Sequence, residues 1–204
     1  RDSGGRIMPA EHYAVSEISI VLASVFAIHR LAPNGFWLAS FASLLIGAVA
    51  ALGAWRFGSG QFEALETLHL TAAVQGGLVS MMFLSADMAM KARAQQSTRL
   101  AVVGLFMASL FATSSSPSLV PVFSLVWLVV AIIVMAIYAQ TDRFLTVSCM
   151  SIMLVGLLVV RKNSYLDAAV SFHLYHLMIA AWLILLPFCL SRLPKRASVL
   201  ATEG

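Results

Sequence analysis

The sequence predicts an all-α, polytopic membrane helical bundle with about seven transmembrane helices. Hydrophobic residues make up 60% of the 204 residues, charged residues make up 11%, and the mean hydropathy is +0.91. These values are far from the averages of soluble proteins. The apolar runs are long and unbroken, whereas the strands of a membrane barrel alternate between apolar and polar residues. Helices therefore remain as the structure that satisfies every backbone polar group in lipid.

Seven apolar segments approach the length of about 20 residues that one membrane crossing requires. We expect these spans at residues 13–31, 36–55, 65–88, 100–115, 121–139, 144–160 and 166–190. The fourth is the weakest, because its apolar part is short and runs into a serine- and threonine-rich stretch that is also typical of a re-entrant turn. Ser164 and Asp167 have the spacing of a capping box and are expected to open the last helix. The predicted order is a polar segment over 1–12, a transmembrane domain over 13–191 and a basic, then polar tail over 192–204.

The basic residues predict an orientation in the membrane. With seven spans, eight of the thirteen lysines and arginines fall on the side of the C-terminus. The positive-inside rule then predicts an integral protein of the plasma (inner) membrane, with the N-terminus outside and the C-terminus in the cytoplasm. The net charge of +4 is modest and reflects loop residues, which argues against nucleic acid as a partner. Membrane lipids are the expected partners, and other membrane proteins are the second class.

Ionisable residues at membrane depth form the candidate site. Such side chains are costly in lipid, so they usually face the bundle interior or a wet cavity and often serve a function. In the predicted topology several of them lie at one level, in the outer half of the membrane. They come from the first, third and seventh helices and are Glu17, Glu66, His69, His173 and His176.

The spacing of these residues indicates a metal site. His173 and His176 are three positions apart and share one face of a helix, and Glu66 and His69 have the same spacing on another helix. The three histidines would bind Zn²⁺ and leave a position open for water, whose pKa zinc lowers to about 7. Glu17 and Glu66 are the candidate catalytic residues, which would orient a ligand or move the proton. The alternative is that the histidines only hydrogen-bond to neighbouring helices.

Two segments carry a resemblance to a known superfamily. The last helix reads Ser-Phe-His-Leu-Tyr-His-Leu-Met-Ile-Ala-Ala-Trp over residues 171–182, and the first opens with Val-Ser-Glu-Ile over 15–18. These segments resemble the last-helix histidine motif and the first-helix acidic position of the seven-transmembrane superfamily of alkaline ceramidases and adiponectin- and progestin-type receptors. The resemblance implies zinc-dependent hydrolysis of lipid amides, with His69, His173 and His176 as the zinc ligands.

The chain departs from the superfamily pattern at three places. The last two histidines are three positions apart instead of four, and the second helix ends in Gly-Ala-Trp-Arg-Phe-Gly over 53–58, where the superfamily has a histidine. His69 would have to replace that ligand from the third helix. Asp87, the best candidate for the superfamily's aspartate, would lie about 27 Å along the helix from His69, at the opposite face of the membrane.

Three classes of function follow from these residues. A zinc-dependent hydrolase of membrane lipid amides would need His69, His173 and His176 to converge. A non-enzymatic membrane subunit or assembly factor would use the polar groups only as contacts between helices. A proton-coupled carrier would use Glu17 and the histidines as a relay, although such carriers typically contain paired broken helices. Whether the chain is an enzyme depends on whether these side chains meet.

Overall fold

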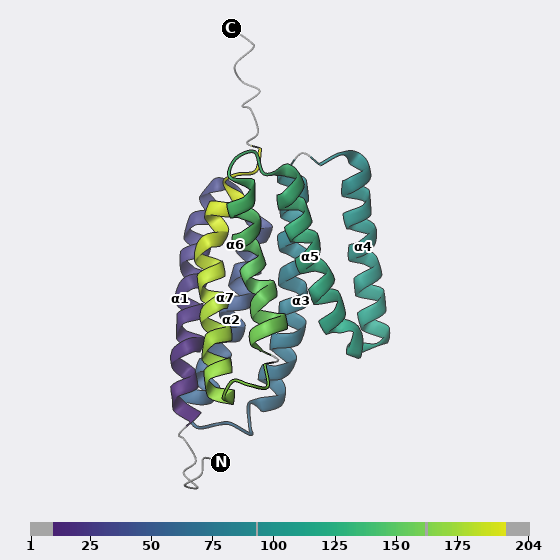
Figure 1. Ribbon diagram of the computed structural model, residues 1–204. Coiled ribbons are helices and arrows are strands. Elements are labelled where there is room, and N and C mark those ends of the chain that lie inside the picture. Colours follow the sequence, from purple (N-terminus) through teal and green to yellow (C-terminus); the bar gives the residue numbers. More distant parts are fainter. Residues whose placement is uncertain (1–9, 93, 162, 195–204) are drawn as a thin grey trace.

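The computed structural model describes residues 10–92, 94–161 and 163–194, and these residues form an all-α bundle (Figure 1). Most of the predicted N-terminal segment, the basic residues Arg93 and Lys162, and the tail from residue 195 lie outside the described residues. Seven helices are long and apolar enough to cross a membrane, so the predicted fold class is confirmed. They are α1 (Tyr13–Leu31), α2 (Trp37–Gly58), α3 (Glu66–Lys91), α4 (Gln96–Ser115), α5 (Val120–Tyr138), α6 (Arg143–Val155, continued by a π-helix over Gly156–Val160) and α7 (Ala168–Leu190).

The fourth segment is a full helix, and the described chain has no re-entrant turn there. In its C-terminal half, hydroxyl groups bond to backbone carbonyl oxygens of the preceding turn. Ser109 Oγ donates to the carbonyl oxygen of Leu105 at 2.7 Å, and Thr113 Oγ1 donates to that of Ser109 at 2.7 Å. These bonds satisfy the hydroxyls within the helix, as an apolar environment requires. Pro117 then opens the short 3-10 turn that leads into α5.

The last helix begins at Ala168, later than the predicted start at residue 166. The predicted capping box, with Ser164 as its first residue, was wrong. Asp167 is the N-cap residue itself: its Oδ1 accepts from the backbone N of Ala169 at 2.8 Å and of Val170 at 3.4 Å. Ser164 lies in the preceding turn. An aspartate before the first helical residue satisfies the free N–H groups by itself, so no serine is needed one turn earlier.

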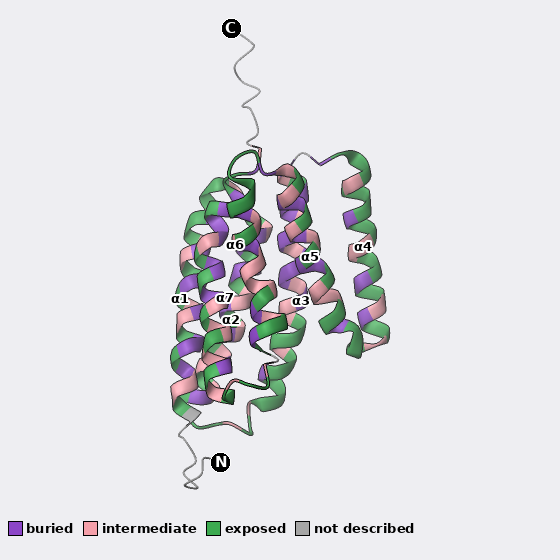
Figure 2. Cartoon of the chain, in the orientation of Figure 1, coloured by how far each residue is buried: buried purple, intermediate pink, exposed green. Residues whose placement is uncertain are grey.

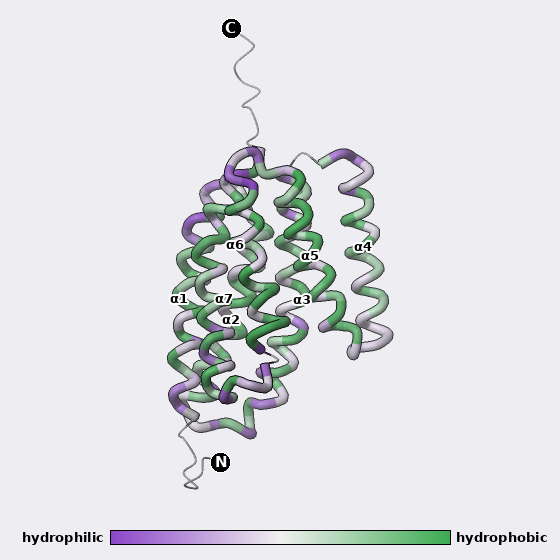
Figure 3. The backbone as a smooth tube through the Cα atoms, in the orientation of Figure 1, coloured by the Kyte–Doolittle hydropathy of each residue, from purple (hydrophilic) through white to green (hydrophobic). Residues whose placement is uncertain are grey.

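Helix α4 lies at the edge of the bundle (Figure 1). Helix α1 packs against α2 and α7, α3 packs against α2 and α5, and α6 packs against α5 and α7. Hydrophilic residues gather mainly at the two ends of the bundle, with hydrophobic residues between them (Figure 3). Helices α1, α3, α5 and α7 begin at the same end, which we call the N-terminal end of the bundle. The chain is thus an integral membrane protein, and its described residues form a bundle of seven helices.

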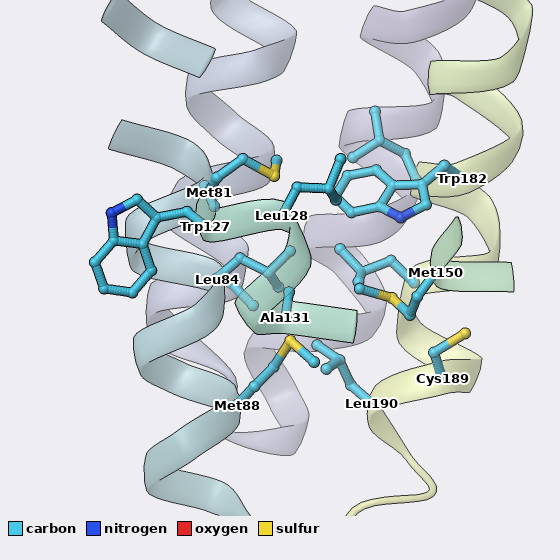
Figure 4. Packing of buried hydrophobic residues seen from close by; sticks show 14 of the residues in the cluster. Met81, Leu84, Met88, Trp127, Leu128, Ala131, Met150, Trp182, Cys189 and Leu190 are labelled. Atoms are coloured by element: carbon cyan, nitrogen blue, oxygen red, sulfur yellow. The ribbon is translucent and has the colours of Figure 1, made fainter. Parts of the chain in front are cut away.

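The apolar core lies where α3, α5, α6 and α7 meet (Figure 4). Its largest side chains are fully or almost fully buried, and two of them are tryptophans. Trp127 donates from Nε1 to Ser109 Oγ at 2.9 Å, which ties α5 to α4. The residues labelled in Figure 4 are Met81, Leu84, Met88, Trp127, Leu128, Ala131, Met150, Trp182, Cys189 and Leu190.

Asp87 connects α3 to the start of α2, at the end of the bundle opposite the N-terminal end. Its side chain is buried, and Oδ2 accepts a hydrogen bond from the backbone N of Ala39 at 2.9 Å. The first N–H groups of a helix lack partners within the helix, and the positive end of the helix dipole favours a carboxylate there. Asp87 therefore stabilises the fold far from His69, which lies in the first turn of the same continuous helix.

Replacing Asp87 with asparagine should lower the stability of the protein. The amide keeps the size of the carboxylate but removes its charge and replaces one acceptor oxygen with a buried NH2 donor, so the hydrogen bond to Ala39 N–H loses its charge assistance, at a cost of about 1–3 kcal/mol. Thermal unfolding in detergent would measure the change. The matched control is Asp142→Asn, because Asp142 forms an exposed pair with Arg192 at 3.0 Å, and such pairs contribute about 0–1 kcal/mol. Equal melting temperatures for the two variants would contradict the capping role.

Candidate functional site

Three of the predicted site residues meet near the N-terminal end of the bundle. Glu17 comes from α1, His69 from α3 and His176 from α7. Oε1 of Glu17 lies 3.6 Å from Nε2 of His69 and 3.4 Å from Nε2 of His176. Glu17 is only 2% exposed and His69 is 8% exposed. We call these three side chains the carboxylate–imidazole cluster.

Gly53 of α2 makes room for this cluster. A Cβ atom at Gly53 would lie 2.5 Å from Oε1 of Glu17 and 2.8 Å from Nε2 of His69. The backbone of α2 therefore passes directly against the carboxylate, as small residues permit between membrane helices. Four helices thus enclose the cluster, one of them through its backbone. Gly53 was not predicted as a site residue, because a glycine within an apolar helix does not indicate which residues of the neighbouring helices lie against it.

The orientation of His176 shows which nitrogen faces the carboxylate. Its Nδ1 lies 2.7 Å from the carbonyl oxygen of Phe172, which can only accept, so Nδ1 carries a hydrogen and donates. In a neutral ring Nε2 then presents a lone pair toward Glu17. Oε1 of Glu17 and Nδ1 of His69 are buried and have no hydrogen-bond partner among the described residues. Because the lone pair of His176 Nε2 and the carboxylate repel each other, and because a buried unpaired charge is costly, a proton or a metal ion between Nε2 of His176 and Oε1 of Glu17 would stabilise the cluster.

His173 lies in a separate hydrogen-bonded chain. Its Nδ1 is 3.1 Å from Oγ of Ser16, and its Nε2 is 2.7 Å from Nδ1 of His12. Both ring nitrogens are therefore engaged away from the carboxylate–imidazole cluster. The structure brings His69 and His176 together at Glu17 and places His173 beside the helix that carries Glu17. A metal-binding role for His173 stays a prediction.

Glu66 lies at the rim of this end of the bundle. Its carboxylate is 3.4 Å from the guanidinium of Arg56, and its side chain is half exposed. Nε of Arg56 also donates to the carbonyl oxygen of Phe62 at 2.8 Å. These contacts tie the end of α2 to the loop before α3. Glu66 is thus paired with a cation at the surface, whereas Glu17 is buried between two imidazoles.

An aromatic layer covers the cluster on the side of the N-terminal end. It consists of Tyr13, Phe57 and Phe172, whose ring centroids lie 5.4 Å (Tyr13–Phe57), 4.4 Å (Tyr13–Phe172) and 5.7 Å (Phe57–Phe172) apart. Phe172 also stacks on the ring of His176 at 3.9 Å. Each aromatic residue lies one helical turn from Glu17, Gly53 or His176 on its own helix, and this spacing was the signal available in the sequence. Apolar rings of this kind lower the local dielectric constant and so strengthen electrostatic interactions within the cluster.

The donor chemistry of the cluster fits zinc. Imidazole nitrogen and carboxylate oxygen are both common zinc ligands, and two ligands of a tetrahedral zinc ion lie about 3.3 Å apart. The two distances from Oε1 of Glu17, 3.4 Å and 3.6 Å, are close to that value. As the side chains stand, the described residues contain no group of three or more His, Cys, Asp and Glu that could hold a metal ion. The side chain of His69, of Glu17 or of both would therefore have to move if the cluster held a metal ion.

No family model, curated protein or solved structure matches this chain. Inference about its function therefore depends on the seven-helix architecture and on the chemistry of Glu17, His69 and His176.

Proposed function

We propose that this membrane protein is a zinc-dependent hydrolase of membrane lipid amides, with the metal held by Glu17, His69 and His176. One observation carries the proposal: two imidazole nitrogens approach a single buried carboxylate oxygen that has no other partner among the described residues. A cation there would neutralise the carboxylate and relieve the repulsion between Oε1 of Glu17 and the lone pair of His176 Nε2. Zinc, when bound, would supply an activated water near neutral pH.

The surroundings of His176 support a metal-binding role. Metal-binding histidines usually donate their second ring N–H to a carboxylate, a backbone carbonyl or water, which sets the tautomer and the ring orientation. The Nδ1 of His176 makes such a bond to the carbonyl oxygen of Phe172 at 2.7 Å. Stacking of Phe172 on the same ring holds its plane. Nε2 is therefore oriented toward Glu17 before any metal binds.

The depth of the cluster supports a lipid as the substrate. Glu17 and His69 lie within the first two turns of α1 and α3, so they are roughly 5–7 Å from the helix ends. The hydrocarbon core of a bilayer is about 30 Å thick, and the headgroup regions lie outside it. The amide that joins an acyl chain to a polar headgroup lies at this boundary. A lipid entering from the membrane would thus bring its amide close to the level of the cluster.

Metal content is the first test of the proposal. Protein purified in detergent without chelators should contain close to one zinc per chain by mass spectrometry, and His69→Ala and His176→Ala should each lose most of it. Removing one of three ligands should weaken zinc binding strongly, because the remaining two ligands cannot complete the coordination of the ion. His29→Ala is the control, since His29 lies in the last turn of α1 at the opposite end of the bundle.

The same measurement separates the competing functions. Loss of zinc in His173→Ala as well would make His173 a ligand and restore the three-histidine site. Zinc retained in both His69→Ala and His176→Ala would contradict the site proposed here. A wild-type protein without zinc would contradict the hydrolase and favour a proton-coupled carrier or a non-enzymatic subunit, in which a proton shared by Glu17 and an imidazole takes the place of the metal.

A further inference from the structure

Helices α4 and α5 diverge toward the end of the bundle that carries the C-terminus (Figure 1). A groove with a volume of about 220 Å³ lies between them. Its walls come from the first half of α4 and the second half of α5, so it is located in the half of the membrane next to that end. Much of α4 is exposed along its length (Figure 2). In a bilayer, a groove of this kind contains either a lipid chain or part of another protein.

The lining of the groove changes along its length. The inner part is apolar and includes Val102 and Leu105 of α4 and Val130 and Val134 of α5. Thr98 and Tyr138 lie at the mouth, near the start of α4 and at the last residue of α5. An apolar interior with hydroxyl groups at the membrane surface matches an amphiphile with an acyl chain and a polar headgroup.

Two arginines are close in the chain to the residues at the mouth. Arg99 follows Thr98 on α4 and is exposed. Arg143 donates from Nε to the carbonyl oxygen of Ala139 at 3.2 Å, one residue beyond Tyr138. In the described part of the chain neither arginine is paired with a carboxylate, whereas Arg192 nearby is paired with Asp142. The guanidinium of Arg99 and the terminal nitrogens of Arg143 are therefore not engaged by a carboxylate of the described residues and could bind an anion.

We propose that the groove between α4 and α5 binds one acyl chain of an anionic phospholipid, whose phosphate lies at Arg99 and Arg143. The acyl chain fills the apolar space that α4 and α5 leave open, and the headgroup neutralises the two cations. Basic pockets between membrane helices bind anionic headgroups in this way. The bound lipid would also stabilise α4, which is the least buried of the seven described helices against the rest of the protein. This site is independent of the carboxylate–imidazole cluster, which lies near the opposite end of the bundle.

Native mass spectrometry of the purified full chain with added phosphatidylglycerol or phosphatidylcholine tests the proposal. Wild-type protein should retain phosphatidylglycerol in preference to phosphatidylcholine. An arginine near the membrane surface contributes about fivefold to the binding of an anionic lipid, so Arg99→Gln and Arg143→Gln should each reduce the preference by about that factor. Ala101→Phe places a ring in the groove and should abolish retention. Ala108→Phe is the matched control, because Ala108 is an exposed alanine of α4 outside the groove.

Three results would overturn the proposal. The first is equal retention of the two lipids by the wild type, because the arginines would then make no selection. The second is equal retention of phosphatidylglycerol by Ala101→Phe and Ala108→Phe, because the groove would then not hold the lipid. The third is a dimeric wild type that Ala101→Phe converts to monomers, because the groove would then be an interface with a second copy. The arginine variants keep the test decisive if Ala101→Phe fails to fold.

Discussion

Glu17→Gln is expected to reduce hydrolysis of an N-acylated membrane lipid by about 10²-fold or more, because the substitution removes the charge of one of the three proposed zinc ligands. The substitution keeps the volume of the side chain between His69 and His176 but removes the negative charge. The variant therefore tests the effect of the carboxylate's charge on the rate while the packing around the side chain stays the same. Release of fatty acid from a fluorescent N-acyl lipid in mixed micelles would measure the rate.

The control for this variant is Glu63→Gln. Glu63 is exposed in the loop between α2 and α3, so its charge is solvated and its replacement should leave the rate unchanged. A normal melting temperature for Glu17→Gln, together with a low rate, would place the defect in the chemistry. Equal rates for Glu17→Gln and the wild type would remove Glu17 from the reaction. No hydrolysis of any N-acyl lipid by zinc-loaded wild-type protein would contradict the proposed substrate class.

Gly53→Ala is expected to disrupt the cluster without changing any of its polar groups. The added methyl group would lie 2.5 Å from Oε1 of Glu17, 2.6 Å from its Cδ and 2.8 Å from Nε2 of His69. One of these groups must therefore move. A displacement of about 1 Å at a reacting group can cost about 10²-fold in rate, and overpacking of this kind costs about 1–3 kcal/mol in stability. Zinc content, hydrolysis rate and melting temperature should all fall.

Gly77→Ala provides the matched control for this prediction. Gly77 lies within α3, and a Cβ atom there would meet nothing within 4 Å. The exchange should be neutral or slightly stabilising, since alanine favours the helix over glycine by up to about 1 kcal/mol. If Gly53→Ala behaves like Gly77→Ala in all three measurements, then the close approach of α2 to Glu17 does not matter for the site.

Local properties of the sequence were sufficient for the class and the approximate positions of the spans. Length and apolarity alone decide whether a segment can cross a membrane, and no distant contact changes that condition. The same properties were less informative at the ends of segments. The serines and threonines of α4 looked like a turn, but their hydroxyls bond within the helix. The start of α7 depends on which side chain caps it, and Asp167 takes that place instead of Ser164.

The sequence by itself determined that this protein is a seven-helix membrane bundle with ionisable residues near one end. Only the tertiary structure decided which of those residues meet. His173 and His176 are three positions apart and so differ by about 60° around the helix. That angle directs His176 to Glu17 and His173 to Ser16 and His12. The rotation of each helix is set by how its neighbours pack, including the close approach at Gly53, and spacing within one helix contains no information about that rotation.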